Sequence, residues 1–227
     1  MRHDVFTWAL ILALTVCAAK GQGFMNLDFE SARISIIGTN ELQPFIATTN
    51  ALPDWSAFWG AGQLSSVDYN PNDFAAFTAV YLEGSNSEVL IGNFSVGLVG
   101  DGSIRQTGLV PADAESLLFD AFFSASQSSS PLAVSLDGQD LTYSAISSAV
   151  NSSGETYTIY GADIAAFAGQ DETLTFSCPQ GSSGTDILDD IQFSTMIVPE
   201  PSMLSLIFGS CGILIYARYR FQKKTNR

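Results

Sequence analysis

The residue whose type and position most suggest chemistry is Asp189, near the end of an apolar segment. A period of two places its side chain on one face of a strand with three apolar residues, Ile187, Ile191 and Phe193. We therefore expect the carboxylate to point inward, which is costly unless it is hydrogen-bonded, paired or bound to a metal. A cation and a set of hydrogen bonds both remain open as its partner, and Arg33 or Arg105 could pair with it.

Aromatic residues are the second group that could act on a ligand, because exposed rings stack on the CH faces of sugars. Trp55, Phe58 and Trp59 are clustered, and Tyr69 follows closely. Large aromatic residues of β-sandwiches usually belong to the core, and we expect this of Trp55. Phe58, Trp59 and Tyr69 are the candidates for carbohydrate binding, with Trp59 open to either interpretation.

The composition excludes several kinds of catalysis. The only histidine is His3, and residues 24–198 contain no lysine. Ser-His-Asp and Cys-His catalysis, histidine-bound zinc and a Schiff-base lysine are therefore excluded. Paired carboxylates could still hydrolyse glycosides, from Asp113 with Glu115 or Asp171 with Glu172. These pairs fall in predicted turns, so we expect no enzyme.

Charge and cysteine content narrow the partners further. Residues 24–198 contain two arginines and 21 acidic residues, a formal charge of −19. Such a surface repels nucleic acid, and no basic stripe offsets it. Cys178 is the only cysteine of this segment, so no disulfide can form within it, and its alternation with Leu174 and Phe176 predicts a packed core thiol.

The elements that must position these residues are expected to be strands, because short alternating runs recur between Gly, Asn, Ser and Asp. Leu132–Leu136 followed by Asp137-Gly138 predicts a hairpin, and Asp163–Phe167 a single helical turn. This spacing of strands and turns is typical of an all-β sandwich or barrel. The predicted strands are 33–37, 45–49, 77–82, 89–99, 115–123, 132–136, 141–146, 156–160, 173–178 and 187–193.

The N-terminus has the features of a secretory signal peptide. An apolar run from Val5 to Cys17 follows Arg2, and small residues come next, so residues 1–21 are expected to be removed. A lipoprotein signal at Leu14-Thr15-Val16-Cys17 is the alternative, although Val16 is bulky where a small residue is required.

The C-terminus combines three features in a fixed order. Val198-Pro199-Glu200-Pro201-Ser202 is followed by an uncharged apolar run over 203–217. The tail 218–227 then carries five cations that would act as a stop-transfer signal: Arg218, Arg220, Lys223, Lys224 and Arg227. Fifteen helical residues span about 22 Å, less than the roughly 30 Å bilayer core, which would suit a buried core helix. The absence of an amphipathic stripe and the basic tail favour a membrane helix.

This order resembles the PEP-CTERM protein-sorting signal of Gram-negative bacteria, over about thirty residues, 197–227. The resemblance implies recognition of the Pro-Glu-Pro segment by a membrane enzyme of the exosortase type. It also implies an inner-membrane intermediate and then delivery to the cell surface or extracellular matrix. Two prolines around a glutamate favour an extended backbone, which a processing enzyme can grip.

Residues 24–196 carry a second resemblance, to jelly-roll carbohydrate-binding modules of the galactose-binding-like kind. The matching segments are Asn26–Glu30, Leu52–Trp55, Tyr160–Gln170 and Ile187–Phe193. The resemblance implies an antiparallel jelly-roll sandwich whose first and last strands are tied by a structural calcium ion at Glu30, Asp189 and Asp190. It also implies association with extracellular polysaccharide.

The sequence therefore predicts an exported, non-catalytic surface or matrix protein that associates with polysaccharide. A purely structural surface protein without a ligand is the main alternative. A carboxylate-based glycoside hydrolase is the third.

Overall fold

The computed structural model describes residues 22–39, 43–71, 78–84, 88–123, 132–180 and 184–198. Within these ranges no helix is long and apolar enough to cross a membrane. The predicted signal peptide 1–21, the residues Pro199, Glu200, Pro201 and Ser202, the apolar run 203–217 and the five cations of the tail lie outside the described residues. Val198 lies inside them.

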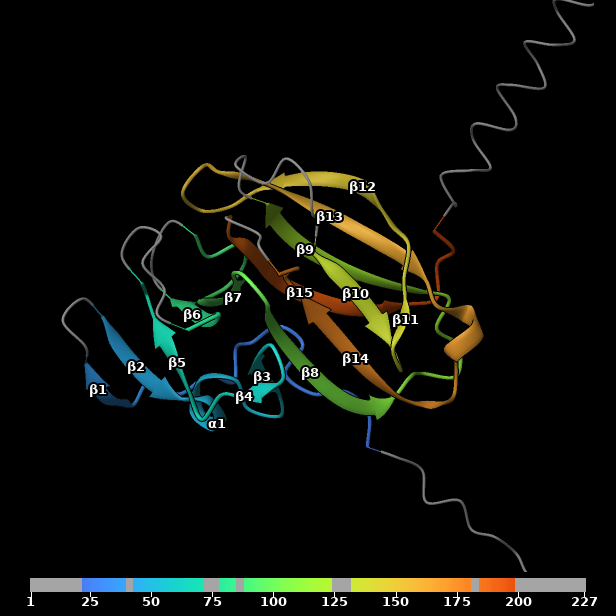
Figure 1. Ribbon diagram of the computed structural model, residues 1–227. Coiled ribbons are helices and arrows are strands. Elements are labelled where there is room, and N and C mark those ends of the chain that lie inside the picture. The colour runs from blue at the N-terminus through green and yellow to red at the C-terminus, as the bar shows by residue number, and fades with distance from the viewer. Residues whose placement is uncertain are drawn as a thin grey trace, which may run out of the picture.

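Two β-sheets form the described part of the chain, which confirms the all-β prediction (Figure 1). The larger sheet has nine strands, in the order β1 (Ile36–Thr39), β2 (Pro44–Ala47), β5 (Ser66–Tyr69), β6 (Val80–Gly84), β7 (Phe94–Leu98), β15 (Asp186–Ser194), β9 (Ser116–Phe123), β13 (Thr156–Asp163) and β12 (Tyr143–Val150). The smaller sheet has six, in the order β11 (Gln139–Asp140), β10 (Ala133–Leu136), β14 (Asp171–Ser177), β8 (Gly102–Leu109), β3 (Ser56–Trp59) and β4 (Gly62–Gln63). All the pairings are antiparallel except that of β5 with β6, which is parallel, so a wholly antiparallel fold was wrong at this point.

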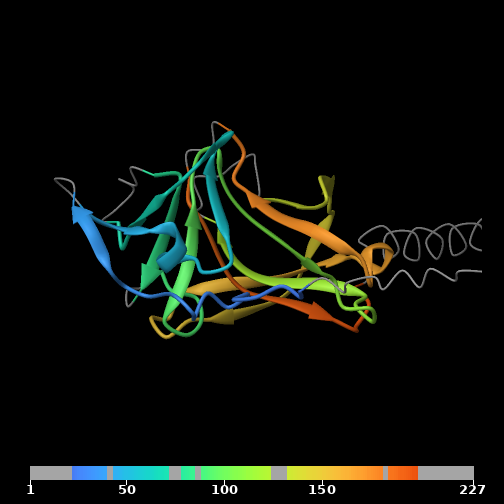
Figure 2. The same ribbon diagram turned by 90° about the horizontal axis from the view of Figure 1, so that it is seen from below.

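The main core lies between the two sheets, which Figure 2 shows from below as two layers. Phe119 of β9 meets Phe176 of β14 edge to face, with ring centroids 5.4 Å apart. Trp55 and Cys178 are both buried in this core, as predicted. A smaller apolar cluster, formed by Tyr81, Leu90, Tyr157 and Ile187, covers part of the opposite, outer face of the nine-stranded sheet.

Local turn chemistry was predicted well. The β10–β11 hairpin turns at Asp137 and Gly138, both with positive φ. One turn of 3-10 helix, η1 (Ala165–Phe167), follows Asp163, whose Oδ1 accepts a hydrogen bond from the Ala165 N–H. The predicted strand 45–49 was too long, because Thr48 and Thr49 belong to the short helix α1 (Thr48–Ala51).

A β-bulge in β15 overturns the expected alternation of its side chains. The pairing with β9 shifts between Asp189 and Gln192, and Asp190 has a positive φ of 42°. Asp189 is buried, as predicted, but faces outward with Ile187 beneath the smaller cluster. Ile191 and Phe193, which follow the bulge, face the main core instead.

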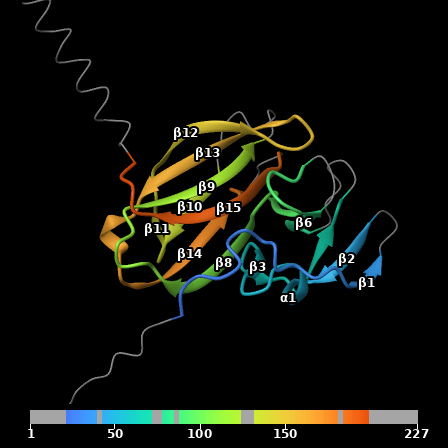
Figure 3. The ribbon, with the colours of Figure 1, turned by 180° about the vertical axis from the view of Figure 1, so that it is seen from behind.

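The opening segment 26–30 is a turn and not the predicted first strand, because Asn26 and Phe29 both have positive φ. Phe29 is fully buried against Trp55, and the Trp55 Nε1 donates to the Asn26 carbonyl at 2.9 Å. The Ile191 N–H donates to the Leu27 carbonyl at 3.0 Å. The N-terminal segment, blue in Figure 3, passes β8 and β3 and still reaches the last strand.

Candidate functional site

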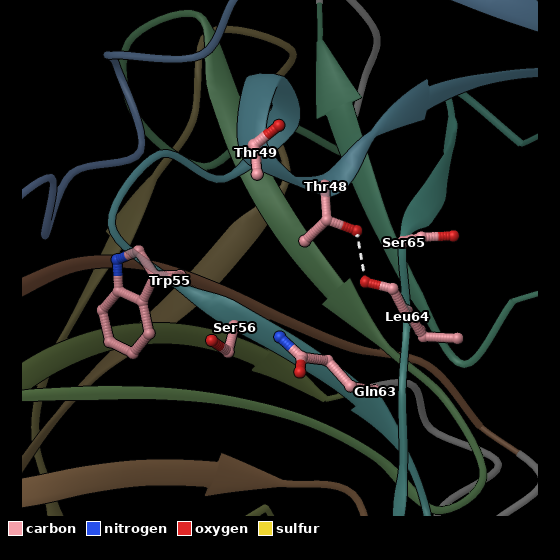
Figure 4. Close-up of a pocket in the computed structure, with 7 residues that line it drawn as sticks. All are labelled: Thr48, Thr49, Trp55, Ser56, Gln63, Leu64 and Ser65. Atoms are coloured by element: carbon pink, nitrogen blue, oxygen red, sulfur yellow. Dashed lines mark hydrogen bonds between the residues drawn. The ribbon is translucent and has the colours of Figure 1, made fainter.

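A recess of about 380 Å³ lies where α1 meets the β3–β4 hairpin (Figure 4). Its lining comes from α1, β3, β4 and the residues that follow β4: Thr48, Thr49, Trp55, Ser56, Gln63, Leu64 and Ser65. The Thr48 hydroxyl donates to the Leu64 carbonyl at 2.8 Å, which fixes α1 to the hairpin. The Gln63 amide points toward Ser56 across the recess.

The recess contains no charged residue, although the chain carries a strong excess of acids. Four hydroxyl groups and one amide line it; the Thr48 hydroxyl already donates to Leu64 and can only accept, while the others can both donate and accept hydrogen bonds. The volume lies within the range of small-ligand sites, about 300–1,000 Å³. This combination suits a neutral ligand with many hydroxyl groups.

The outer face of the six-stranded sheet continues from the recess. Gln63 is paired with Phe58 across the β3–β4 hairpin, so both side chains lie on one face. The Arg105 guanidinium lies over the Phe58 ring, 4.4 Å from its centroid. Arg105 therefore covers one face of the Phe58 ring. A sugar could stack, as predicted, only on the other face.

The other two aromatic candidates are separated from each other. Trp59 ends β3 and is 54% exposed, but it does not line the recess, and its side chain points to the opposite face of the strand from Phe58. Tyr69 is half-buried on β5 of the other sheet and packs against the main core. The structure therefore places Phe58 and Trp59 on one hairpin but on opposite faces of it, and Tyr69 on the other sheet.

The carboxylates predicted to bind calcium hold one turn, residues 90–95, from two sides. Asp189 Oδ2 accepts hydrogen bonds from the Ser95 hydroxyl at 2.6 Å and the Ile91 N–H at 3.1 Å. Glu30 accepts from the Asn93 N–H and Nδ2, both at 2.7 Å, and from the Phe94 N–H at 3.1 Å. This arrangement is the hydrogen-bonded alternative that the sequence left open.

Asp190 is oriented away from this turn, because its Oδ2 accepts a hydrogen bond from the Gln192 side chain at 2.6 Å. Over the described residues, no three acidic, histidine or cysteine side chains are grouped closely enough to hold a metal ion. A calcium ion at Glu30, Asp189 and Asp190 stays a prediction.

Asp120 is a buried acid that the sequence analysis missed. It lies directly opposite Asp189 on the neighbouring strand β9, and both side chains are at most 3% exposed. Burial, with a smaller contribution from the Asp190 charge, raises the pKa of Asp120 to about 7. Burial also raises the pKa of Asp189 to about 7, against its hydrogen bonds. The signal was present in the sequence as one acid inside the apolar run Leu117–Phe123.

One of the acid pairs proposed for glycoside hydrolysis, Asp171 with Glu172, does not converge. Asp171 and Glu172 are consecutive on β14, so they point to opposite faces, Asp171 exposed and Glu172 buried. Asp113 lies in an exposed turn, while the Glu115 N–H donates to the Ser194 carbonyl at 2.8 Å.

The buried acids predict that the protein is more stable in mild acid. Unfolded aspartates titrate near pKa ~3.9, so between about pH 4 and 7 the folded state binds more protons. Stability is then fully present below pH ~4 and is lost as the pH rises through about 7. Each of the two aspartates contributes about 1.4 kcal/mol per pH unit between pH 5 and 7, or about 5 kcal/mol together, so we expect a melting temperature about 10–20 °C higher at pH 5 than at pH 8. Thermal melts across this range measure it.

Asp120→Asn should raise the melting temperature at pH 8 and remove about half of the pH dependence, since one titrating group is lost. Asp113→Asn, at an exposed turn, is the matched control and should leave the dependence unchanged. A melting temperature that is constant or higher at pH 8 would contradict this account.

The same melts with calcium and with a chelator test the predicted ion, which requires stabilisation by calcium that Asp189→Asn removes.

Comparisons with known proteins show no family for this chain. A scan of protein-family models finds no match, and a search of the curated proteins finds none either. Among solved structures, the chain is similar to the secreted serine protease VesC from Vibrio cholerae, at 15% identity and a TM-score of 0.30. The match covers 53% of this chain and 25% of that one, so it spans about a quarter of the protease's length and carries no functional argument.

Proposed function

We propose that this protein is an exported, non-catalytic surface or matrix protein that associates with a neutral extracellular polysaccharide. The observation that carries the binding proposal is the uncharged recess between α1 and the β3–β4 hairpin. Polysaccharides present hydroxyl groups that both donate and accept hydrogen bonds, as do the groups of the recess. The Trp59 ring, 54% exposed at the other end of β3, offers a separate apolar surface on which a sugar ring can stack.

The charge of the protein favours a neutral polysaccharide over an anionic one. With a formal charge of −19 over residues 24–198, the domain repels acidic sugars as it repels nucleic acid. The recess itself contributes no cation that would offset this repulsion. We propose a fold of the jelly-roll kind for the two sheets, and a structural calcium ion as its one candidate cofactor.

The proposal for export rests on the sequence of both ends. A removable signal peptide over 1–21 would deliver the chain across the inner membrane, and the apolar run 203–217 with its basic tail would retain it there. An exosortase-type enzyme would then process the chain at Val198–Ser202 and release it to the cell surface or matrix. The protein would be that of a Gram-negative bacterium.

A purely structural surface protein is the second candidate, supported by the acidic, hydrogen-bonded framework around residues 90–95. It differs from the first in one respect: its recess binds nothing. A carboxylate-based hydrolase is the third, and activity assays on neutral polysaccharides with Glu172→Gln test it.

Gln63→Ala should weaken binding to neutral polysaccharide about tenfold, because a side-chain hydrogen bond contributes about 0.5–1.5 kcal/mol. Affinity electrophoresis of the full chain in detergent, with the neutral exopolysaccharide of the source cells, measures this change. Gln139→Ala is the matched control, since Gln139 is exposed on β11 at the far edge of the same sheet. Trp59→Ala should also weaken binding. Wild-type protein that shows no retardation would support the structural alternative.

Replacing Pro199, Glu200 and Pro201 together with alanine should leave a membrane-held precursor of full size. The extended backbone that the processing enzyme grips depends on the two prolines. Immunoblots of cell fractions from the source bacterium measure the precursor and the surface form. Alanines at Ser152 and Ser153, in the exposed β12–β13 turn, are the control. Normal amounts of processed protein at the surface would refute the sorting proposal.

A further inference from the structure

The chain does not leave the domain at the end of β15, because the next residues fold back onto the nine-stranded sheet. The Ser116 hydroxyl donates a hydrogen bond to the Met196 carbonyl at 2.7 Å, and the Met196 N–H donates to the Ser194 hydroxyl oxygen at 3.0 Å. Ile197 is 74% exposed, whereas Val198 is only 8% exposed. The backbone is therefore fixed at Met196, and Val198 is the side chain that turns inward.

Val198 occupies an apolar groove on the outer face of the nine-stranded sheet. A hollow of about 290 Å³ lies there, lined by Leu118 of β9, Ile159 of β13, Ile146 of β12 and residues 196–198. Gly161 provides the room, because a Cβ at this position would lie 2.5 Å from Ile146 Cδ1 and 2.8 Å from Val198 Cγ2. We call these residues, Leu118, Ile146, Ile159 and Gly161, the exit groove.

The exit groove holds the first residue of the segment that the sorting enzyme would recognise. From Val198 to Met203, where the apolar run begins, the chain has five Cα–Cα steps, which extend to at most about 18 Å. An enzyme that grips an extended peptide needs several consecutive residues free of other contacts. The enzyme and the exit groove therefore compete for Val198.

We propose that the exit groove sequesters Val198 and so limits the rate at which a membrane-bound processing enzyme engages the Pro-Glu-Pro segment. This proposal rests on the proposed sorting function. Val198 must leave the groove before the segment 198–202 can extend as one unit. The partner is an enzyme that binds an extended, proline-containing peptide between the folded domain and the membrane.

Gly161→Val tests the proposal, because it fills the groove and leaves residues 196–202 unchanged. In a pulse-chase experiment on the full chain in its source cells, its processing rate constant should rise about tenfold, the factor that corresponds to exposing one valine side chain. Ile146→Ala should give a smaller rise, because Ile146 is 49% exposed and forms only part of the groove. Unlike Gly161→Val, this substitution adds no bulk to a strand. Val150→Ala, on the same strand at 62% exposure and outside the groove, should process at the wild-type rate.

Methyl NMR of the purified full chain in detergent gives a measurement that does not depend on processing. The Val198 methyl groups should show contacts with the methyl groups of Leu118 and Ile146 in the wild type and lose them in Gly161→Val, which fills the groove. Wild-type or slower processing in both variants, while the Pro199, Glu200 and Pro201 triple-alanine variant is blocked, would overturn this proposal alone. Normal processing of the triple-alanine variant would overturn the sorting function and this proposal together.

Discussion

The hydrogen bonds from residues 90–95 to two carboxylates connect three parts of the chain that are far apart in sequence. Glu30 binds the turn from the N-terminal segment, and Asp189 binds it from the last strand. Leu90 of this turn packs in the smaller apolar cluster with Tyr157 and Ile187. With two arginines for 21 acids in residues 24–198, backbone N–H groups and hydroxyls are the partners most available to these carboxylates.

Acidic residues are buried elsewhere in the protein but do not line the recess at α1. Six acidic residues are buried among the described residues: Asp68, Glu83, Asp120, Glu172, Asp186 and Asp189. Burial raises the pKa of Asp186 to about 6, and its hydrogen bond with Cys178 opposes the rise. The recess at α1 is lined by neither acids nor cations, so a ligand that binds there meets neutral hydrogen-bonding groups together with Leu64 and Trp55. A neutral, hydroxyl-rich polymer fits this chemistry without any counter-ion.

Features that depend on nearest neighbours in the sequence were predictable. The Asp137-Gly138 hairpin, the turn after Asp163 and the core positions of Trp55 and Cys178 all follow from local chemistry and burial preference. Features that depend on a single backbone irregularity were not. The bulge at Asp190 exchanges the faces of every residue after it, because the side-chain period of a strand is two.

The candidate site shows the same division. The sequence left Trp59 open between core and surface, and its separation from Tyr69 depends on which sheet each strand joins. The recess lies between α1 and the hairpin that follows it. That hairpin is held through the pairing of β3 with β8, a strand of eight residues that the periodicity did not predict. Asp120 was missed for another reason. Its position opposite Asp189 depends on the pairing of β9 with β15, which its neighbours in the sequence do not indicate.

The claim that a neutral polysaccharide binds in the α1 recess is tested most directly by mapping the contact in solution. Isotope-labelled full chain in detergent micelles would be titrated with neutral oligosaccharides prepared from the exopolysaccharide of the source cells, and amide chemical shifts followed. We expect the largest changes at Thr49, Gln63 and Ser65, which line the recess. Changes confined to the outer face of the nine-stranded sheet around Asp120, or none at saturating oligosaccharide, would contradict it.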